Sequence, residues 1–212
     1  SFKLRDWGSS EAAVASHTRL YSYTPPLRAS AVQVNGDPLV QQQKRTCFPT
    51  NNAWEVHKFG GASLATAELY KTVGDLLISE AARGGEQVVG AIPTMAVVSA
   101  RGGMTDLLVQ VVDSALNNLQ AAETALGEAV ESQIAVLREL APPDITGAIE
   151  TSFRQDAQDI LSVVRSLRML QSVPAVTMEV VTGFGEIWSA QTLYAYLQTK
   201  TTACQWIDAR DV

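Results

Sequence analysis

Residues 54–63 constrain the fold and the chemistry of this chain more than any other stretch. A short apolar segment containing Lys58 ends in two glycines and a serine, and a helix-like pattern follows. Gly60 and Gly61 let the backbone turn sharply and approach a ligand closely, because they lack a Cβ. Backbone N–H groups that precede a helix form a site for anions, and Lys58 would add a positive charge beside them. The stretch therefore predicts a strand–turn–helix corner that can hold a phosphate.

This corner is not a Walker loop. In that motif four residues separate the glycines and the lysine follows them, whereas Lys58 precedes Gly60 and Gly61. An ordinary corner with a solvated lysine would have the same spacing, so this stretch alone leaves both interpretations open.

Three further stretches follow in a fixed order. They are Val97-Val98-Ser99-Ala100 with Gly102-Gly103-Met104-Thr105-Asp106-Leu107-Leu108, then Gly185-Glu186-Ile187-Trp188-Ser189-Ala190-Gln191, and finally Trp206-Ile207-Asp208-Ala209-Arg210-Asp211-Val212. Together with residues 56–63 they resemble, in order, the motifs of the aspartate kinases of the amino-acid kinase superfamily. The form of the stretch at 185–191 is closest to the plant and algal bifunctional aspartate kinase–homoserine dehydrogenases. The resemblance covers about residues 54–212.

The resemblance implies an α/β fold, a three-layer αβα sandwich of the amino-acid kinase type, of which this chain would be the N-terminal part. It implies transfer of the ATP γ-phosphate, with Mg²⁺, to the side-chain carboxylate of L-aspartate, the first step towards lysine, threonine and methionine. Family members continue with most of the adenine-nucleotide contacts and with regulatory modules. We therefore expect a fragment that is inactive alone and a homo-oligomer at full length, and no residue here is assigned to Mg²⁺.

The resemblance also assigns roles to individual residues. Lys58 would be the catalytic residue that contacts the transferring phosphate, and the remaining phosphate and ATP contacts would come from Gly60, Gly61 and Ser63. The aspartate substrate would be held by Ser99, Ala100, Thr105, Glu186 and Ser189, with Glu186 pairing with its ammonium group. The sequence departs from the family at Ala62, where threonine is usual, and at 101–103, so the conformation of that loop is open.

Plainer explanations exist for several of these residues. Thr105 could cap a helix, and Glu186 could offset the dipole at a helix N-terminus. Surface ion pairs explain Asp208, Arg210 and Asp211 as well as a ligand would, so these three stay outside the catalytic set. The two histidines, His17 and His57, show no clustered ligand pattern and predict no metal site.

Charge and hydropathy argue against a membrane protein and against a nucleic-acid-binding protein. The chain has 212 residues and a net charge of −6, and no run approaches the roughly 18 apolar residues that a membrane span needs. Residues 54–212 carry ten Lys and Arg against nineteen Asp and Glu, which argues against nucleic-acid binding. Cys47 and Cys204 form no disulfide framework, and Cys204 is expected to be a buried reduced thiol.

Residues 1–53 have a different character. They carry six Lys and Arg against three Asp and Glu and lack sustained periodicity, which predicts a disordered extension. A basic, serine-bearing, acid-poor segment is typical of an organelle transit peptide, so a chloroplast location is expected, and a cytoplasmic one otherwise. A merely variable extension remains the alternative.

Hydrophobic periodicity predicts the elements of the remaining chain. We expect strands at 54–59, 87–92, 95–99 and 203–208, and helices at 65–82, 104–119, 121–140 and 145–171, with a further helix that opens near Glu186. Strands that alternate with helices favour an α/β sheet with helices on both faces. Two other functions stay open: another amino-acid kinase, such as one for glutamate or acetylglutamate, and a non-catalytic half-domain that binds a partner.

Overall fold

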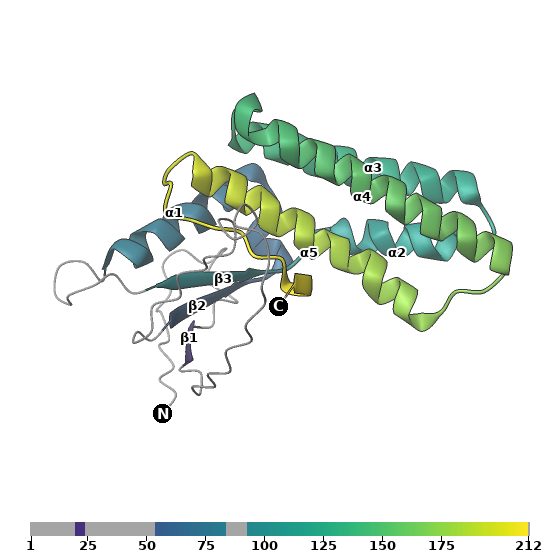
Figure 1. Cartoon of the computed structure of the whole chain (residues 1–212), viewed down its shortest axis with the longest axis horizontal. Coiled ribbons are helices and arrows are strands. Elements are labelled where there is room, and N and C mark those ends of the chain that lie inside the picture. Colours follow the sequence, from purple (N-terminus) through teal and green to yellow (C-terminus); the bar gives the residue numbers. More distant parts are fainter. Residues whose placement is uncertain (1–19, 24–53, 84–92, 212) are drawn as a thin grey trace, which may run out of the picture.

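The computed structural model describes residues 20–23, 54–83 and 93–211. They are mostly helical, with one small sheet (Figure 1). The elements are β1 (Leu20–Tyr23), β2 (Trp54–Phe59), the 3₁₀ turn η3 (Gly61–Leu64), α1 (Ala67–Arg83), β3 (Thr94–Val98), α2 (Met104–Ser114), α3 (Leu119–Leu140), α4 (Pro143–Leu170), α5 (Ala175–Gln198) and the 3₁₀ turn η4 (Ala209–Asp211).

The sheet has the order β1-β2-β3. β2 and β3 are parallel, with Lys58 opposite Val97, and β1 is antiparallel to β2. His57 and Phe59 are buried on the side where α1 packs, whereas Lys58 and Val97 are exposed on the other side. The described helices thus cover one face of the sheet, so the fold is of the α/β type without a second helical layer in these residues.

Most of the expected elements are present. The strand at 54–59, the strand near 95–99 and the helices at 65–82, 121–140 and 145–171 are confirmed within a few residues of their ends. Within the expected extension 1–53, residues 20–23 form β1; the remainder of that segment and the strand expected at 87–92 lie outside the described residues.

The helix expected at 104–119 is divided. α2 ends at Ser114, and α3 begins at Leu119 with Asn118 at its N-cap position. The Asn118 side chain accepts a hydrogen bond from the Ala121 N–H at 3.1 Å. An asparagine that satisfies the free N–H groups of a first turn favours a new helix start, although the apolar spacing continues through the break.

Two further expectations are wrong. α5 begins at Ala175, so Glu186 lies inside the helix rather than at its start. Gly183 and Gly185 each cost about 1 kcal/mol of helix propensity, which suggested a boundary, but burial of the helix around them outweighs that cost. Residues 203–208 form no strand, because none of the described strands pairs with them and their side chains are at most half-buried.

Two hydrophobic clusters hold the molecule together. One lies among α2, α3, α4 and α5, and the other lies between the sheet, α1 and the C-terminal half of α5. In Figure 1, α5 runs from the bundle of helices to the sheet and lies beside α1. It contributes Val181 and Trp188 to the first cluster and Leu193 and Tyr196 to the second. None of the described helices is both long enough and apolar enough to span a membrane.

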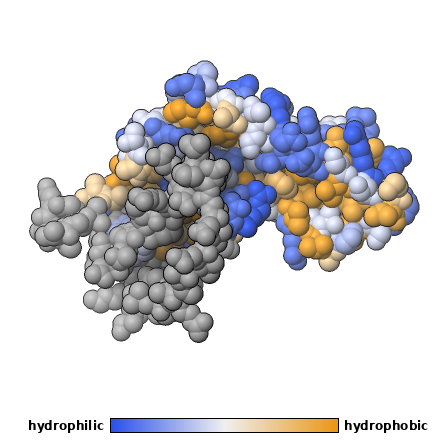
Figure 2. Space-filling view, viewed as in Figure 1, coloured by the Kyte–Doolittle hydropathy of each residue, from blue (hydrophilic) through white to orange (hydrophobic). Residues whose placement is uncertain are grey.

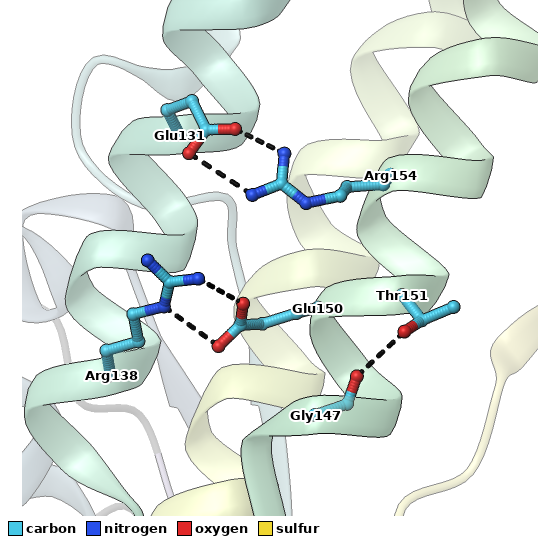
Figure 3. A network of polar contacts seen from close by, with 6 residues as sticks. All are labelled: Glu131, Arg138, Gly147, Glu150, Thr151 and Arg154. Atoms are coloured by element: carbon cyan, nitrogen blue, oxygen red, sulfur yellow. Dashed lines mark hydrogen bonds and ion pairs between the residues drawn. The ribbon is translucent and has the colours of Figure 1, made fainter. Parts of the chain in front are cut away.

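Ion pairs join α3 to α4 on the solvent side (Figure 3). Arg154 pairs with Glu131, and Arg138 donates two hydrogen bonds to Glu150, at 2.9 and 2.5 Å. Exposed pairs of this kind contribute little, about 0–1 kcal/mol each, so the apolar cluster beneath them carries the packing.

At the far end of the bundle, hydrophobic residues are exposed among hydrophilic ones (Figure 2). Met169 and Leu170 at the end of α4, and Val176 and Val180 at the start of α5, are exposed there. The turn that joins α4 to α5 lies away from the sheet (Figure 1).

Candidate functional site

Three of the four sequence motifs meet at Ala100. A Cβ on Gly61 would lie 2.7 Å from the Ala100 carbonyl oxygen, and a Cβ on Gly185 would lie 2.9 Å from the Ala100 Cβ. Real Cβ atoms do not approach other atoms so closely. Only glycine therefore lets the loop after β2, the loop after β3 and the middle of α5 pack at this distance.

Backbone hydrogen bonds fix the two loops to each other. The Ser99 N–H donates to the Phe59 carbonyl oxygen at 2.9 Å, and the Gly102 N–H donates to the Gly61 carbonyl oxygen at 3.1 Å. Both loops leave the carboxyl ends of neighbouring parallel strands, which is the edge where open α/β sheets bind ligands. The first two sequence motifs therefore meet at this edge of the sheet.

Lys58 and Gly60 present an open, positively charged surface. The Lys58 side chain is exposed, and no described residue forms an ion pair with its ammonium group. The Cβ position of Gly60 has no atom within 4 Å. A lysine charge beside accessible backbone can approach an anion, which fits the expected phosphate contact.

Ser63 sits in a different setting from the one expected. A 3₁₀ turn, η3, lies between Gly60 and the start of α1, so the glycines do not lead directly into the helix. The Ser63 N–H donates to the Gly60 carbonyl oxygen at 3.0 Å, and its side chain is buried. The proposed hydroxyl contact to phosphate stays a prediction.

The loop after β3 leads into α2. Gly103, with φ of 81°, holds the N-cap position, so the interpretation of Thr105 as the cap is wrong. Thr105 is exposed in the first turn of α2, Ser99 is half-buried, and Ala100 is buried. The exposed Thr105 hydroxyl is accessible to a ligand.

Glu186 and Ser189 lie on α5 in contrasting environments. Glu186 is exposed and well inside the helix, so it does not offset the charge of a helix N-terminus. Ser189 is fully buried, and its hydroxyl lies 2.8 Å from that of Tyr70. In this structure the Ser189 side chain joins α5 to α1, and its contact with a substrate stays a prediction.

A buried polar network that the sequence did not suggest supports the loop after β3. Arg101 donates to the Gln133 Oε1 atom at 3.1 Å and to the Ser132 hydroxyl at 2.7 Å. Gln133, fully buried on α3, donates to the Thr192 hydroxyl at 2.8 Å. In the sequence, the signal that could have indicated this network was the position of Gln133 within the apolar stripe of α3. Arg101 thereby ties the loop to both α3 and α5.

The fourth motif packs against α5. The Arg210 guanidinium lies 5.6 Å from the centre of the Phe184 ring and donates hydrogen bonds to both carboxylate oxygens of Asp208. The pKa of Asp208 is lowered by this arginine. Asp208 and Arg210 therefore form the ion pair that was one explanation for them, and the motif lies beside the helix that carries Glu186.

Trp188 is part of the hydrophobic core. It is fully buried, and its Nε1–H donates to the Asp156 carboxylate on α4 at 2.8 Å. Burial raises the pKa of Asp156 above its ordinary value, although the hydrogen bond from Trp188 acts in the opposite direction.

Comparison with known proteins adds an independent finding. The relatives of this chain are bifunctional aspartokinase/homoserine dehydrogenases. The chloroplastic enzyme 2 of Arabidopsis thaliana is 25% identical over 186 residues, which cover 88% of this chain and 19% of the relative. The chloroplastic enzyme 2 of Zea mays is 22% identical over 97% of this chain and 21% of its own length.

A bacterial relative shows the same similarity. The bifunctional aspartokinase/homoserine dehydrogenase 2 of Escherichia coli K12 is 27% identical over 74% of this chain and 18% of its own length. The chain thus spans about a fifth of the length of the curated relatives it matches. No protein-family model matches it.

Proposed function

We propose that this chain forms the phosphate-binding part and some of the aspartate-binding part of an aspartate kinase. The observation that carries the proposal is the meeting of the two glycine loops and α5 at Ala100, with the exposed Lys58 at the same edge of the sheet. The similarity to bifunctional aspartokinase/homoserine dehydrogenases supports it. The reaction would transfer the ATP γ-phosphate to the side-chain carboxylate of L-aspartate.

Phosphoryl transfer depends on positioning and on positive potential around the transferring group. Lys58 would supply the positive charge, while the backbone at Gly60 and Gly61 approaches the phosphates and Ser63 donates nearby. Mg²⁺ would arrive on the ATP phosphates and neutralise part of their charge. No residue of this chain is assigned to the ion.

The aspartate would lie against the loop after β3 and the exposed side of α5. Glu186 would pair with its ammonium group, a charge-assisted contact that is stronger than a neutral hydrogen bond. Thr105 and the backbone at Ser99 and Ala100 would position the substrate, and Ser189 would act from within the core. Arg101, held by Gln133 and Ser132, would keep the loop in place.

The proposal extends to location and assembly. The chloroplastic relatives from Arabidopsis thaliana and Zea mays support a plastid location. We also propose that the full-length protein forms a homo-oligomer, as its resemblance to the aspartate kinases implies.

The test is a chimera in which residues 54–211 replace the corresponding part of the Arabidopsis thaliana relative. Aspartyl phosphate, trapped as its hydroxamate, should form only when both aspartate and ATP are present. Lys58→Ala should lower kcat on the order of 10²-fold, as expected for loss of a preorganised charge. Because Lys58 is exposed, the melting temperature should hardly change.

Two results would contradict the proposal. Turnover by the Lys58→Ala chimera at the parent rate would remove Lys58 from the site. A folded chimera that phosphorylates glutamate or acetylglutamate in preference to aspartate would favour another amino-acid kinase.

A further inference from the structure

Three potential metal ligands lie together beneath α1. Glu55 and His57 come from β2, and Glu80 comes from α1. One ligand atom from each of the three side chains lies within 4.8 Å of the other two. The alternation of β2 places Glu55 and His57 on the same face of the sheet, the one that α1 covers.

Two of the three side chains are strongly buried for polar groups. His57 is 2% exposed, Glu80 is 5% exposed, and Glu55 is half-buried. Glu80 lies one turn along α1 from Leu77 of the apolar cluster, and the His57 ring is parallel to that of Phe59 with 6.3 Å between their centres. An imidazole and two carboxylates that gather within this distance are types of side chain that bind metal ions in proteins.

We propose that Glu55, His57 and Glu80 bind a divalent transition metal ion, with Zn²⁺ as the best match. Imidazole and carboxylate are established protein ligands of zinc, and three protein ligands leave one position for water. Mg²⁺ and Ca²⁺ prefer oxygen ligands throughout, so the imidazole of His57 argues against them.

The geometry needs only a small adjustment. Bonds of about 2.1 Å to a tetrahedral ion place the ligand atoms roughly 3.4 Å apart. The ligand atoms now lie within 4.8 Å of one another, so they would have to approach by up to about 1.4 Å, and the carboxylates of Glu55 and Glu80 can do this because their side chains rotate.

The ion would join β2 to α1 directly before the phosphate corner. His57 and Lys58 are neighbours whose side chains point to opposite faces of the sheet. The metal site would therefore hold the strand that carries Lys58 without touching the substrate. The inference does not depend on the proposed kinase activity.

Zinc binding to the full chain can be measured by competition with a chromophoric chelator. We expect one ion per chain, and a loss of affinity of at least about 100-fold in both His57→Asn and Glu80→Gln, because loss of a ligand exceeds loss of an outer partner. Matched controls are His17→Asn, the other histidine, and Glu68→Gln, an exposed glutamate on α1. Both controls should bind zinc like the parent chain.

X-ray absorption of the zinc-loaded parent chain tests the same site without a variant. One imidazole nitrogen and oxygen ligands are expected, and the melting temperature should rise with zinc concentration. Sulfur in the first shell, an unchanged zinc affinity in a folded His57→Asn or Glu80→Gln chain, or no binding by the parent chain would each overturn the proposal.

Discussion

The Tyr70 hydroxyl lies 2.8 Å from the Ser189 hydroxyl, and this buried hydrogen bond joins α1 to α5. Burial raises the pKa of Tyr70, so the phenol stays protonated throughout the neutral range. The bond links the helix that follows the phosphate corner to the helix that carries Glu186. Its removal tests whether Ser189 serves the fold.

Tyr70→Phe should lower the free energy of unfolding by about 1–3 kcal/mol, because the buried Ser189 hydroxyl loses its partner. Urea denaturation of Tyr70→Phe, Ser189→Ala and the double variant gives the coupling energy between the two groups. Additive effects of the two single changes would show that the bond contributes nothing to stability.

Gly74→Ala should destabilise the chain, although alanine is the better helix former. A Cβ on Gly74 would lie 2.4 Å from Cδ1 of the Tyr196 ring, so α1 and α5 would have to separate. Overpacking of this kind costs about 1–3 kcal/mol. The measurement is the midpoint of thermal or urea unfolding.

A matched control for this change lies on α3. Gly127 has no atom within 4 Å of its Cβ position, so Gly127→Ala should stabilise the chain by up to about 1 kcal/mol. Opposite signs for the two glycines would confirm the close α1–α5 contact, whereas stabilisation by both would contradict it.

Asp156→Asn should raise the melting temperature at neutral pH. Burial raises the pKa of Asp156 in the folded chain, so the stability present below its unfolded pKa is lost as pH rises through the folded value. The asparagine removes the charge, and its oxygen can still accept the Trp188 N–H. The gain should vanish near pH 3, where both residues are neutral.

Asp159→Asn provides the comparison for this prediction, because Asp159 is exposed on the same helix. Its effect on the melting temperature should be small at both pH values. A fall in melting temperature for Asp156→Asn at neutral pH would instead mean that attraction to Arg210 outweighs the burial of the carboxylate.

Glu186→Gln should raise the KM for aspartate and lower kcat/KM in the chimera, with little change in the KM for ATP. The residue is exposed in the middle of α5, so the change should leave the melting temperature nearly unaltered. Glu179→Gln, another exposed glutamate on the same helix, is the control. Equal effects on the two substrates would contradict a dedicated contact with the amino acid.

Local patterns in the sequence predicted much of this fold. The apolar spacing of α3 and α4 and the short run of β2 are properties of consecutive residues, so periodicity reveals them. The contact between the loops at Gly61 and Gly102 was not predicted, because the sequence left the conformation of residues 101–103 open. The ligand contacts at Lys58, Gly60 and Glu186 stay predictions.

Features that depend on tertiary contacts could not be predicted from local patterns in the sequence. The glycines at 183 and 185 suggested a helix boundary, but Gly185 is needed because α5 passes close to Ala100. Gln133 is buried only because Arg101 and Thr192 reach it from other elements. Glu80 is distant from His57 in sequence, and only the packing of α1 on the sheet places them together.

The contribution of α5 to both hydrophobic clusters determines how the molecule unfolds. Its side chains enter both hydrophobic clusters, so neither the helical bundle nor the sheet with α1 can lose its interior while the other stays intact. Unfolding should then be a single cooperative event. Amide hydrogens of β2 and of α3, although they belong to different clusters, should exchange with solvent at the same limiting free energy.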